Sequence, residues 1–376
     1  MSGMVAGDPH QGGASWAVLQ YVAGLHGMGH EVMLVEPVPG EALAPGAEVA
    51  RYFRSLPLLD GRAALLAADG EQTVGLPYSE LADFAADADL LLNLSGLLRD
   101  ERLLEPIPVR AFVDLDPGFN QVWAAAGEDM GLDLHTHFVT IGSRVGAQGC
   151  PIPTCGRVWI ASLPPVALEH WPLVDATPQR DAFTSVGNWR SYGSINHGGI
   201  HYGQRAHSLR GLIDLPRRVE AKLQLALGIH PGERADLDAL RRNGWQLLDP
   251  ATLAGTPAAY AEFIRGSRAE LCVAKSGYVE SRSGWFSDRS ACYLASGRPV
   301  VAQDTGFGER LPIGEGLLAF DTAAQAADAI RAVDADPGRH GAAARALAEE
   351  HLDARKVLTA LLERLGGGET EAGASR

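Results

Sequence analysis

Short runs of uninterrupted apolar residues alternate with segments of helical periodicity along most of the chain. A strand that is apolar on both faces has to be covered on both sides, which is typical of parallel strands joined by helices. In the N-terminal half, such runs occupy residues 4–6, 31–36, 90–94, 111–114 and 137–141. The pattern therefore predicts an α/β fold with a doubly wound parallel sheet.

A proline-rich segment interrupts this alternation at residues 162–180. Prolines remove helical hydrogen bonds and stiffen the chain, so we expect this segment to connect two domains. Beyond it, strand candidates lie at residues 182–186, 222–227, 271–274 and 299–303, and helix candidates at 258–265, 288–295, 323–333 and 342–365. The sequence thus predicts two Rossmann-like doubly wound domains that face a central cleft, where ligands of such sheets bind.

The domain boundaries follow from this pattern. We expect residues 1–165 to form the first Rossmann-like domain, residues 166–181 the connector and residues 182–345 the second Rossmann-like domain. Residues 346–366 are expected to form a C-terminal helix that packs back on the first domain. Residues 367–376 are rich in Gly, Glu and Ser and are expected to be a mobile tail.

The charge of the chain excludes two classes of partner. The 376 residues carry 32 Lys and Arg against 46 Asp and Glu, a formal net charge of −14. Nucleic acids and anionic membrane surfaces attract concentrated positive charge, so neither is an expected partner. No apolar run approaches the ~20 residues of a membrane span, and the first residues lack a secretory signal. We therefore expect a cytoplasmic protein without integral membrane association, either a monomer or a homodimer.

The first strand candidate is followed by a polar turn that carries a histidine and two glycines. Gly12 and Gly13 let a backbone approach a ligand closely, and the helix that follows offers free N–H groups to an anion. His10 is suited to act as a general base near neutral pH. Its orienting carboxylate is expected to be Asp114 or Asp116, because the ends of parallel strands meet at one sheet edge. In the alternative, His10 is solvated and the two aspartates only form a turn.

The strongest candidate site lies in the second half of the chain. A predicted strand ends at Lys275, a polar loop with Glu280 follows, and a helix begins near Ser287. A carboxylate at this helix start, Asp288, can accept both hydroxyls of a ribose, and Arg289 with the first-turn N–H groups can hold a diphosphate. In the alternative, the loop caps an ordinary α/β unit, and the helix dipole favours the acid at the helix start.

These motifs resemble those of the GT-B glycosyltransferases, which use nucleotide sugars. Glu280 and Asp288, with seven residues between them, are similar to the E-x7-E motif of that group. Residues 291–301 (ACYLASGRPVV) resemble its E-A-L-A-x-G-x-P-V-V stretch, and the N-terminal glycine turn resembles its GG opening. The resemblance implies a nucleotide-sugar donor site in the C-terminal domain and an acceptor site in the N-terminal domain. It also implies catalysis without a metal or a further cofactor.

The resemblance implies a hexosyltransferase that moves a sugar from a nucleoside-diphosphate sugar to a small-molecule acceptor, in secondary metabolism for instance. The family clamps the diphosphate with an Arg and a Lys after the first strand of the second domain. This chain has Trp189 and Arg190 there, with Lys275 or Arg289 as substitutes. His10 resembles the catalytic histidine of inverting members, whereas the C-terminal motif resembles retaining members, so the stereochemical outcome stays open. The alternatives are a nucleotide-sugar epimerase of the same fold and a non-catalytic nucleotide-sugar-binding module.

Two further segments allow more than one interpretation. Residues 196–205 (NHGGIHYGQR) are polar and glycine-rich, which suits a phosphate loop or a metal pair of His197 and His201. The two glycines between these histidines do not fit a helical metal site. Trp245 either stacks on a nucleobase or belongs to the core, as most tryptophans do.

Overall fold

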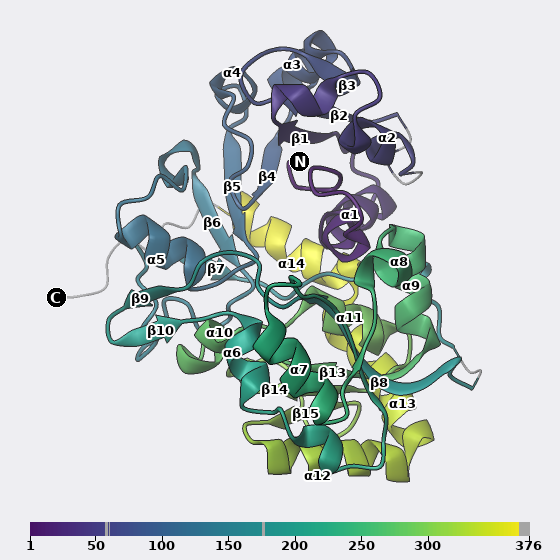
Figure 1. Ribbon diagram of the computed structural model, residues 1–376. Helices are drawn as coiled ribbons and strands as arrows, with labels where there is room; N and C mark the ends of the chain where they lie inside the picture. Colours follow the sequence, from purple (N-terminus) through teal and green to yellow (C-terminus); the bar gives the residue numbers. More distant parts are fainter. Residues whose placement is uncertain (57–58, 60, 175–176, 368–376) are drawn as a thin grey trace, which may run out of the picture.

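The structure is a computed structural model that describes residues 1–56, 59, 61–174 and 177–367. Two β-sheets flanked by helices form an upper and a lower lobe (Figure 1). The predicted α/β class with two Rossmann-like sheets is confirmed. The part of the expected tail from residue 368 onward lies outside the described residues, and so do residues 175 and 176 of the expected connector.

The N-terminal sheet consists of two parts, with strand orders β1-β2-β3 and β4-β5-β6-β7. Ser2 joins them, because it forms parallel bridges with Val35 of β1 and Asn93 of β4. The strand expected at residues 4–6 is therefore wrong: the pairing residue is Ser2, and residues 5–10 already form the turn. β3 pairs antiparallel with β2, and the other strand pairs are parallel. The strands are β1 (Leu34–Val38), β2 (Ala63–Ala67), β3 (Thr73–Gly75), β4 (Leu90–Leu94), β5 (Val109–Asp114), β6 (His137–Thr140) and β7 (Trp159–Ala161).

The helices of the upper lobe connect these strands. They are α1 (Gly12–Gly27), α2 (Glu48–Arg54), α3 (Tyr78–Asp87), α4 (Glu101–Leu104) and α5 (Phe119–Ala125). The helix α1 is almost continuously apolar and is buried along much of its length, because it packs on other helices as well as on its own sheet.

The C-terminal sheet is entirely parallel, with the strand order β12-β11-β8-β13-β14-β15. Its strands are β8 (Arg180–Asn188), β11 (Leu223–Gly228), β12 (Gln246–Leu247), β13 (Ser267–Cys272), β14 (Val300–Gln303) and β15 (Leu317–Phe320). The chain first builds the sheet from β8 toward β12 and then continues on the other side of β8 with β13. The order therefore reverses between β8 and β13, and such a switch point opens a crevice at the carboxyl ends of the strands.

The helices of the lower lobe begin at recognisable sequence signals. Asp249, Thr256 and Asp336 each accept a backbone N–H at a helix start, and a proline occupies the first helical turn in all three cases. The capping side chain pairs a backbone N–H that would otherwise lack an acceptor, and the proline fixes φ near its helical value. The helices are α6 (Arg205–Arg210), α7 (Arg234–Arg242), α8 (Pro250–Ala254), α9 (Pro257–Gly266), α10 (Ser276–Glu280), α11 (Asp288–Ala295), α12 (Ala323–Ala335) and α13 (Pro337–Leu347).

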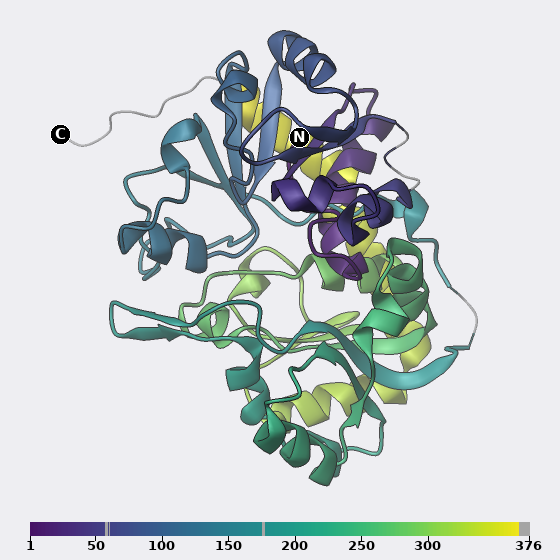
Figure 2. The ribbon, with the colours of Figure 1, turned by 45° about the horizontal axis from the view of Figure 1, so that its top comes forward.

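A short antiparallel hairpin, β9 (Ile195–His197) with β10 (Ile200–Tyr202), precedes α6. It projects from the lower lobe toward α5 of the upper lobe (Figure 2). Three aromatic side chains from the two lobes pack edge to face at its base, where the centre of the Tyr192 ring lies 4.9 Å from the ring centres of both Phe119 and Trp123. The hairpin was not among the expected strands.

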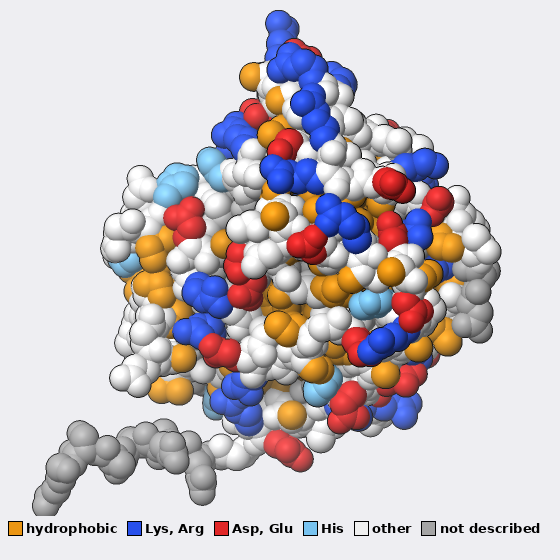
Figure 3. All heavy atoms as spheres, turned by 90° about the horizontal axis from the view of Figure 1, so that it is seen from below, with side chains coloured by type: hydrophobic (Ala, Val, Ile, Leu, Met, Phe, Trp, Pro, Cys, Tyr) orange, Lys and Arg blue, Asp and Glu red, His pale blue; other side chains and the backbone are white. Residues whose placement is uncertain are grey.

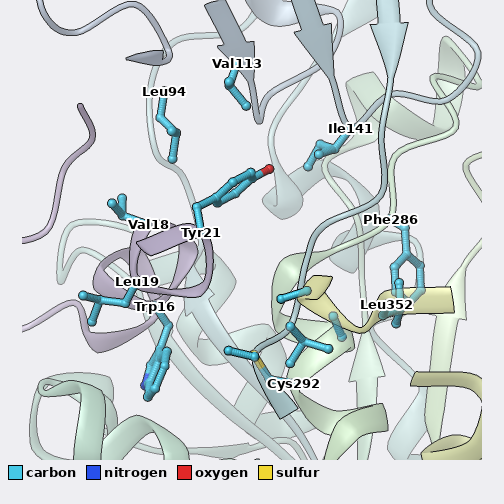
Figure 4. Close-up of a cluster of buried hydrophobic side chains, with 14 of the residues drawn as sticks. Trp16, Val18, Leu19, Tyr21, Leu94, Val113, Ile141, Phe286, Cys292 and Leu352 are labelled. Atoms are coloured by element: carbon cyan, nitrogen blue, oxygen red, sulfur yellow. The ribbon is translucent and has the colours of Figure 1, made fainter. Parts of the chain in front are cut away.

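The chain returns to the upper lobe at its C-terminal end. After a π-helical turn at Ala348–Leu352, α14 (Ala354–Gly366) packs against α1. Gly24 of α1 permits this approach, since a Cβ there would lie 2.6 Å from Leu358 and 2.8 Å from Ala354. The two lobes also share apolar core, in which Tyr21 of α1 points toward Val113 and Ile141 at the ends of β5 and β6 (Figure 4).

Candidate functional site

Arg205, the first residue of α6, spans the switch point of the C-terminal sheet. Its Nη1 donates to the carbonyl oxygen of Asn188 at 2.7 Å, at the end of β8. Its Nε donates to the carbonyl oxygen of Val273 at 2.9 Å, just beyond β13. The guanidinium therefore lies at the place where a doubly wound sheet receives its ligand.

Arg205 is a buried cation without a counterion. Its side chain is buried, and within the described part of the chain no carboxylate forms an ion pair with it. Burial, with a smaller contribution from the positive charge of Arg289, lowers the pKa of Arg205 to about 10. Removing a cation from water is costly unless charge or hydrogen bonds compensate for it. An anionic ligand in the crevice would supply the missing negative charge.

Ser276 provides a second unsatisfied group beside this arginine. Its backbone N–H donates to the carbonyl oxygen of Gln204 at 3.4 Å, and its hydroxyl is buried without a hydrogen-bond partner among the described residues. Gly203 makes this contact possible, because a Cβ there would lie 2.4 Å from the Ser276 hydroxyl. Buried hydroxyls are nearly always hydrogen-bonded, so this one lacks the partner that its burial calls for.

A cluster that joins the two lobes lies next to the crevice. Asp116 follows β5 in the upper lobe, and its Oδ1 accepts hydrogen bonds from Lys275, Tyr278 and Tyr192, the last at 2.6 Å. The ammonium of Lys275 also lies 4.1 Å from the centre of the Tyr192 ring, a cation–π contact. Among the described residues, none donates to Oδ2 of Asp116, whose side chain is 31% exposed. That oxygen is available to a bound molecule.

The charge of Asp116 is stabilised by this cluster. Burial by itself would raise the pKa of Asp116, but the charge and hydrogen bond of Lys275 outweigh it, with further hydrogen bonds from the two tyrosines. The pKa of Asp116 therefore lies below its usual value. The carboxylate remains ionised at neutral pH and can accept a hydrogen bond from a ligand hydroxyl.

The expected pairing of His10 with Asp114 or Asp116 is wrong. Nε2 of His10 lies 2.9 Å from Oε1 of Glu48, the first residue of α2, and both side chains are more than half exposed. The backbone of His10 is left-handed, with a φ of +66° that is uncommon for a residue other than glycine. A histidine–carboxylate pair is present at this sheet edge, but the carboxylate is that of Glu48.

Asp114, one of the two carboxylates expected to orient His10, is buried in its own hydrogen-bond network. It is fully buried at the end of β5, where Asn120 and the backbone of Asp116 donate to Oδ1 at 2.6 and 2.9 Å. Gln121 and Thr140 donate to Oδ2 at 2.8 and 2.7 Å. Burial raises the pKa of Asp114 to about 6 despite these donors. The four hydrogen bonds order the loop that presents its neighbour Asp116 to the cleft.

The glycines at the start of α1 serve packing between the lobes. A Cβ on Gly12 would lie 2.2 Å from the carbonyl oxygen of Thr256, and a Cβ on Gly13 would lie 2.7 Å from the ring of Tyr260. Atoms of the lower lobe thus occupy the space that a Cβ on either glycine would need. Beside them, Nδ2 of Asn188 donates to Oε1 of Gln11 at 3.1 Å, so the start of α1 lies close to the end of β8.

Three expected donor-binding side chains are engaged elsewhere. Trp189 is buried in the core of the lower lobe, and its Nε1 donates to Asp236 at 3.2 Å. Arg190 pairs with Glu233 at 2.6 Å. Arg289 is buried, and its Nε lies 2.5 Å from Oε1 of the fully buried Glu270. An arginine committed to a buried carboxylate is not available for a diphosphate, so this part of the expectation is wrong for Arg289.

The remaining expected residues lie on both sides of the 281–287 loop. Glu280 ends α10 and is exposed, whereas Ser287 caps α11 by accepting the N–H of Arg289 at 3.2 Å. Asp288 is half-buried in the first turn of α11, and burial raises its pKa. Their role in donor binding stays a prediction. Trp245, by contrast, belongs to the core of the lower lobe, as one of its two interpretations expected.

Sequence reasoning missed Arg205, Ser276, Tyr192 and Tyr278 as site residues. The signal for Arg205 was present, since it ends the glycine-rich stretch interpreted as a possible phosphate loop. The two tyrosines gave no signal, because an isolated tyrosine in a loop is compatible with many environments.

In residues 1–56, 59, 61–174 and 177–367, no group of three or more His, Cys, Asp or Glu side chains could hold a metal ion. In the same part of the chain, no helix is both long and apolar enough to cross a membrane.

Comparison with known proteins agrees with this architecture. Residues 232–363, which include the 275–290 segment, match a family model described as glycosyl transferase-like. None of the curated proteins matches the chain by sequence. The described features and the matched region together define a chain with the fold of the GT-B glycosyltransferases, as the resemblance in sequence predicted.

Solved structures with this fold cover nearly the whole chain. HepE of Anabaena, in complex with UDP and glucose, is 13% identical, with a TM-score of 0.57 over 97% of this chain and 98% of that one. Sucrose-phosphate synthase of Thermosynechococcus elongatus is 14% identical, with a TM-score of 0.56 over 98% and 99%. AviGT4, a glycosyltransferase involved in avilamycin A biosynthesis, is 14% identical, with a TM-score of 0.53 over 97% and 94%.

Proposed function

We propose that the protein transfers a hexose from a nucleoside-diphosphate sugar to a small-molecule acceptor, without a metal or a further cofactor. The donor would occupy the crevice of the lower lobe, and the acceptor would approach from the upper lobe. Glu280 and Asp288 are the proposed partners of the donor ribose, with Ser287 shaping the helix start beside them.

The observation that carries the proposal is the uncompensated charge of Arg205. A buried guanidinium at the switch point needs an anion, and a diphosphate carries charge and oxygen acceptors that match its planar donors. The unpartnered hydroxyl of Ser276 adds a further donor in the same crevice. In the reaction, these groups would stabilise the negative charge that develops on the departing diphosphate.

The relatives support the chemical class of the donor. HepE was solved with UDP and with UDP-glucose, and it shares the fold over nearly the full length of both chains. AviGT4 acts in avilamycin A biosynthesis, which fits a small-molecule acceptor. A uridine nucleotide is therefore the first donor to test.

The acceptor side of the proposal rests on His10 and Asp116. The imidazole of His10, oriented by Glu48, is the proposed base that removes the proton from the acceptor hydroxyl. The free Oδ2 of Asp116 is the proposed hydrogen-bond acceptor that positions the acceptor or the sugar. Asp116 follows β5, and His10 lies in the turn that follows the Ser2 bridge of the same sheet.

Calorimetric titration with UDP and with uridine tests the donor site. Ser276→Ala and Arg205→Lys should each weaken UDP binding about tenfold, which corresponds to one lost charge-assisted hydrogen bond, and leave uridine binding unchanged. The matched control is Ser208→Ala, which removes another buried hydroxyl without a partner, on α6. Equal affinities for UDP in all four proteins would refute the diphosphate site.

A turnover assay separates the alternatives. Incubation with nucleotide sugars and a panel of acceptor alcohols should release the nucleoside diphosphate only when an acceptor is present. A changed sugar on an intact nucleotide would instead identify an epimerase. Heat of binding without any turnover would identify a binding module.

A further inference from the structure

A second cavity lies at the far edge of the N-terminal sheet, between the two lobes and the C-terminal helix. Its volume is about 410 Å³, within the range of small-molecule sites. The walls come from three parts of the chain: the ends of β6 and β7, the loop after β14 through Arg310, and α14 with the π-helical turn before it.

The inner wall of this cavity is apolar. Ile160 and Leu163 contribute from the upper lobe, and Val357, Ala360 and Leu361 from α14. Val357 and Leu361 are buried, whereas Ala360 is exposed in the cavity wall. Such a lining favours the body of an organic molecule over a bare inorganic ion, because burial of apolar surface stabilises the complex.

The rim carries an excess of positive charge. The lining contains three cationic side chains, those of Arg310, Lys356 and Arg364, and one carboxylate, that of Glu350. Glu350 forms an ion pair with Lys356 at 3.1 Å. Arg364 donates only to the carbonyl oxygen of Ala161, at 3.0 Å, and no described residue pairs with Arg310. The chain as a whole has a net charge of −14, and both signs are mixed over the face drawn in Figure 3. The lining of this cavity thus holds three Lys and Arg side chains against one carboxylate, the reverse of the excess of acidic residues in the whole chain.

The cavity is separate from the donor crevice. Gly142 and Trp285 form a bridge between the lobes, and the N–H of Ser143 donates to the carbonyl oxygen of Gly284 at 3.3 Å. Asp116 follows β5 on one side of this contact, whereas the cavity adjoins β7, the edge strand on the other side. A ligand here would not compete directly with a nucleotide in the crevice.

We propose that this cavity binds an organic anion, namely a carboxylate or phosphate monoester with an apolar body. The apolar inner wall takes the body, and Arg310 and Arg364 at the rim take the charged group. Because both lobes and α14 contribute to the wall, the bound molecule stabilises the arrangement of the lobes seen here.

Octanoate is the probe for a calorimetric titration of the full chain. We expect one saturable site, weaker binding at higher salt because the charged rim is screened, and at least tenfold weaker binding of octanol and of sulfate. Octanol lacks the charge and sulfate lacks the apolar body. Absence of saturable octanoate binding, or equal binding of octanol, would overturn the proposal.

Variants locate the site. Ala360→Trp fills the cavity from α14 and should abolish octanoate binding, and Arg310→Gln should weaken it roughly two- to fivefold, as expected for an exposed charge. The control is Arg241→Gln on α7, another exposed arginine, which does not line the cavity and should bind octanoate like the unaltered chain. Thermal unfolding verifies that each variant is folded. Unchanged octanoate affinity in folded Ala360→Trp would show that the anion binds elsewhere and would overturn the proposal.

Discussion

Lys275 and Asp116 lie 159 positions apart in the chain and form an ion pair between the two lobes. The Lys275 side chain is 12% exposed, and the rings of Phe119, Tyr192 and Tyr278 surround its ammonium. The pair therefore connects the proposed donor crevice of one lobe to the proposed acceptor side of the other. It makes Asp116 important for both the stability of the lobe contact and the proposed chemistry.

Asp116→Asn should destabilise the protein, because it leaves the buried ammonium of Lys275 without a counterion. Loss of one partner of a buried pair costs about 3–5 kcal/mol, and the partial exposure of Asp116 reduces this to about 2 kcal/mol. Urea unfolding measures the change. Asp328→Asn, which removes an exposed ion pair with Arg331, serves as the control and should cost at most about 0.5 kcal/mol. Equal effects of the two substitutions would contradict the structural role of the pair.

Asp114 should make the stability depend on pH. Burial raises its pKa to about 6 in the folded protein, above the ~3.9 of an unfolded chain. Its stabilising contribution is therefore fully present below pH ~4 and is lost as the pH rises through 6, by roughly 3 kcal/mol in total. Asp114→Asn cannot ionise, so the difference in unfolding free energy between the two proteins should change over this range. A difference that stays constant from pH 4 to pH 7 would contradict the assignment.

Arg289 should matter for stability and not for donor binding. Arg289→Met leaves the fully buried Glu270 without its partner, which costs about 3–5 kcal/mol. Replacement of both residues, Glu270→Met with Arg289→Met, should recover much of that loss, because no charge then remains buried. Urea unfolding and UDP titration measure the two properties. If a folded Arg289→Met variant binds UDP tenfold more weakly, Arg289 contributes to the donor site and this prediction is wrong.

His10 and Glu48 should affect turnover more than binding. If His10 accepts the acceptor proton, His10→Ala should lower kcat by about 10²–10⁴ and leave the affinity for UDP unchanged. Glu48→Gln keeps the hydrogen bond but removes the charge, and we expect a smaller loss of kcat. Glu128→Gln, an exposed glutamate of the same lobe, is the control. A parallel loss of UDP affinity would show that His10 binds the donor and does not act as a base.

Much of the fold could be predicted from the sequence, because buried parallel strands leave continuous apolar runs and each lobe repeats this pattern. The pairing of Ser2 with β1 and β4 could not be predicted, since a single bridging residue leaves no periodic pattern of apolar residues in the sequence. The hairpin at residues 195–202 also lacks an apolar run, because it projects from the sheet and packs through the aromatic rings at its base.

The site was only partly predictable, for a different physical reason. Sequence places Asp116 and Lys275 at strand ends but does not show which charge each side chain meets across the lobes. Arg205 and Arg289 both lie in the first turn of a helix, and only the tertiary structure distinguishes them. One has Glu270 as its partner, and the other has backbone carbonyls alone. The sequence did contain one indication of the structural pair. Glu270 lies within the strand at residues 267–272, and a buried carboxylate of this kind needs a cationic partner such as Arg289.

The start of α1 offers a test of how closely the lobes must approach. Gly12→Ala places a Cβ 2.2 Å from the backbone oxygen of Thr256, so α1 or the segment before α9 has to move. We expect a loss of about 1–3 kcal/mol in the free energy of unfolding and a larger radius of gyration in X-ray scattering. Gly27→Ala, at the other end of the same helix, meets no atom closer than 3.7 Å and should be neutral or stabilising by up to about 1 kcal/mol. If Gly12→Ala leaves both measurements as in Gly27→Ala, the lobes do not depend on this contact.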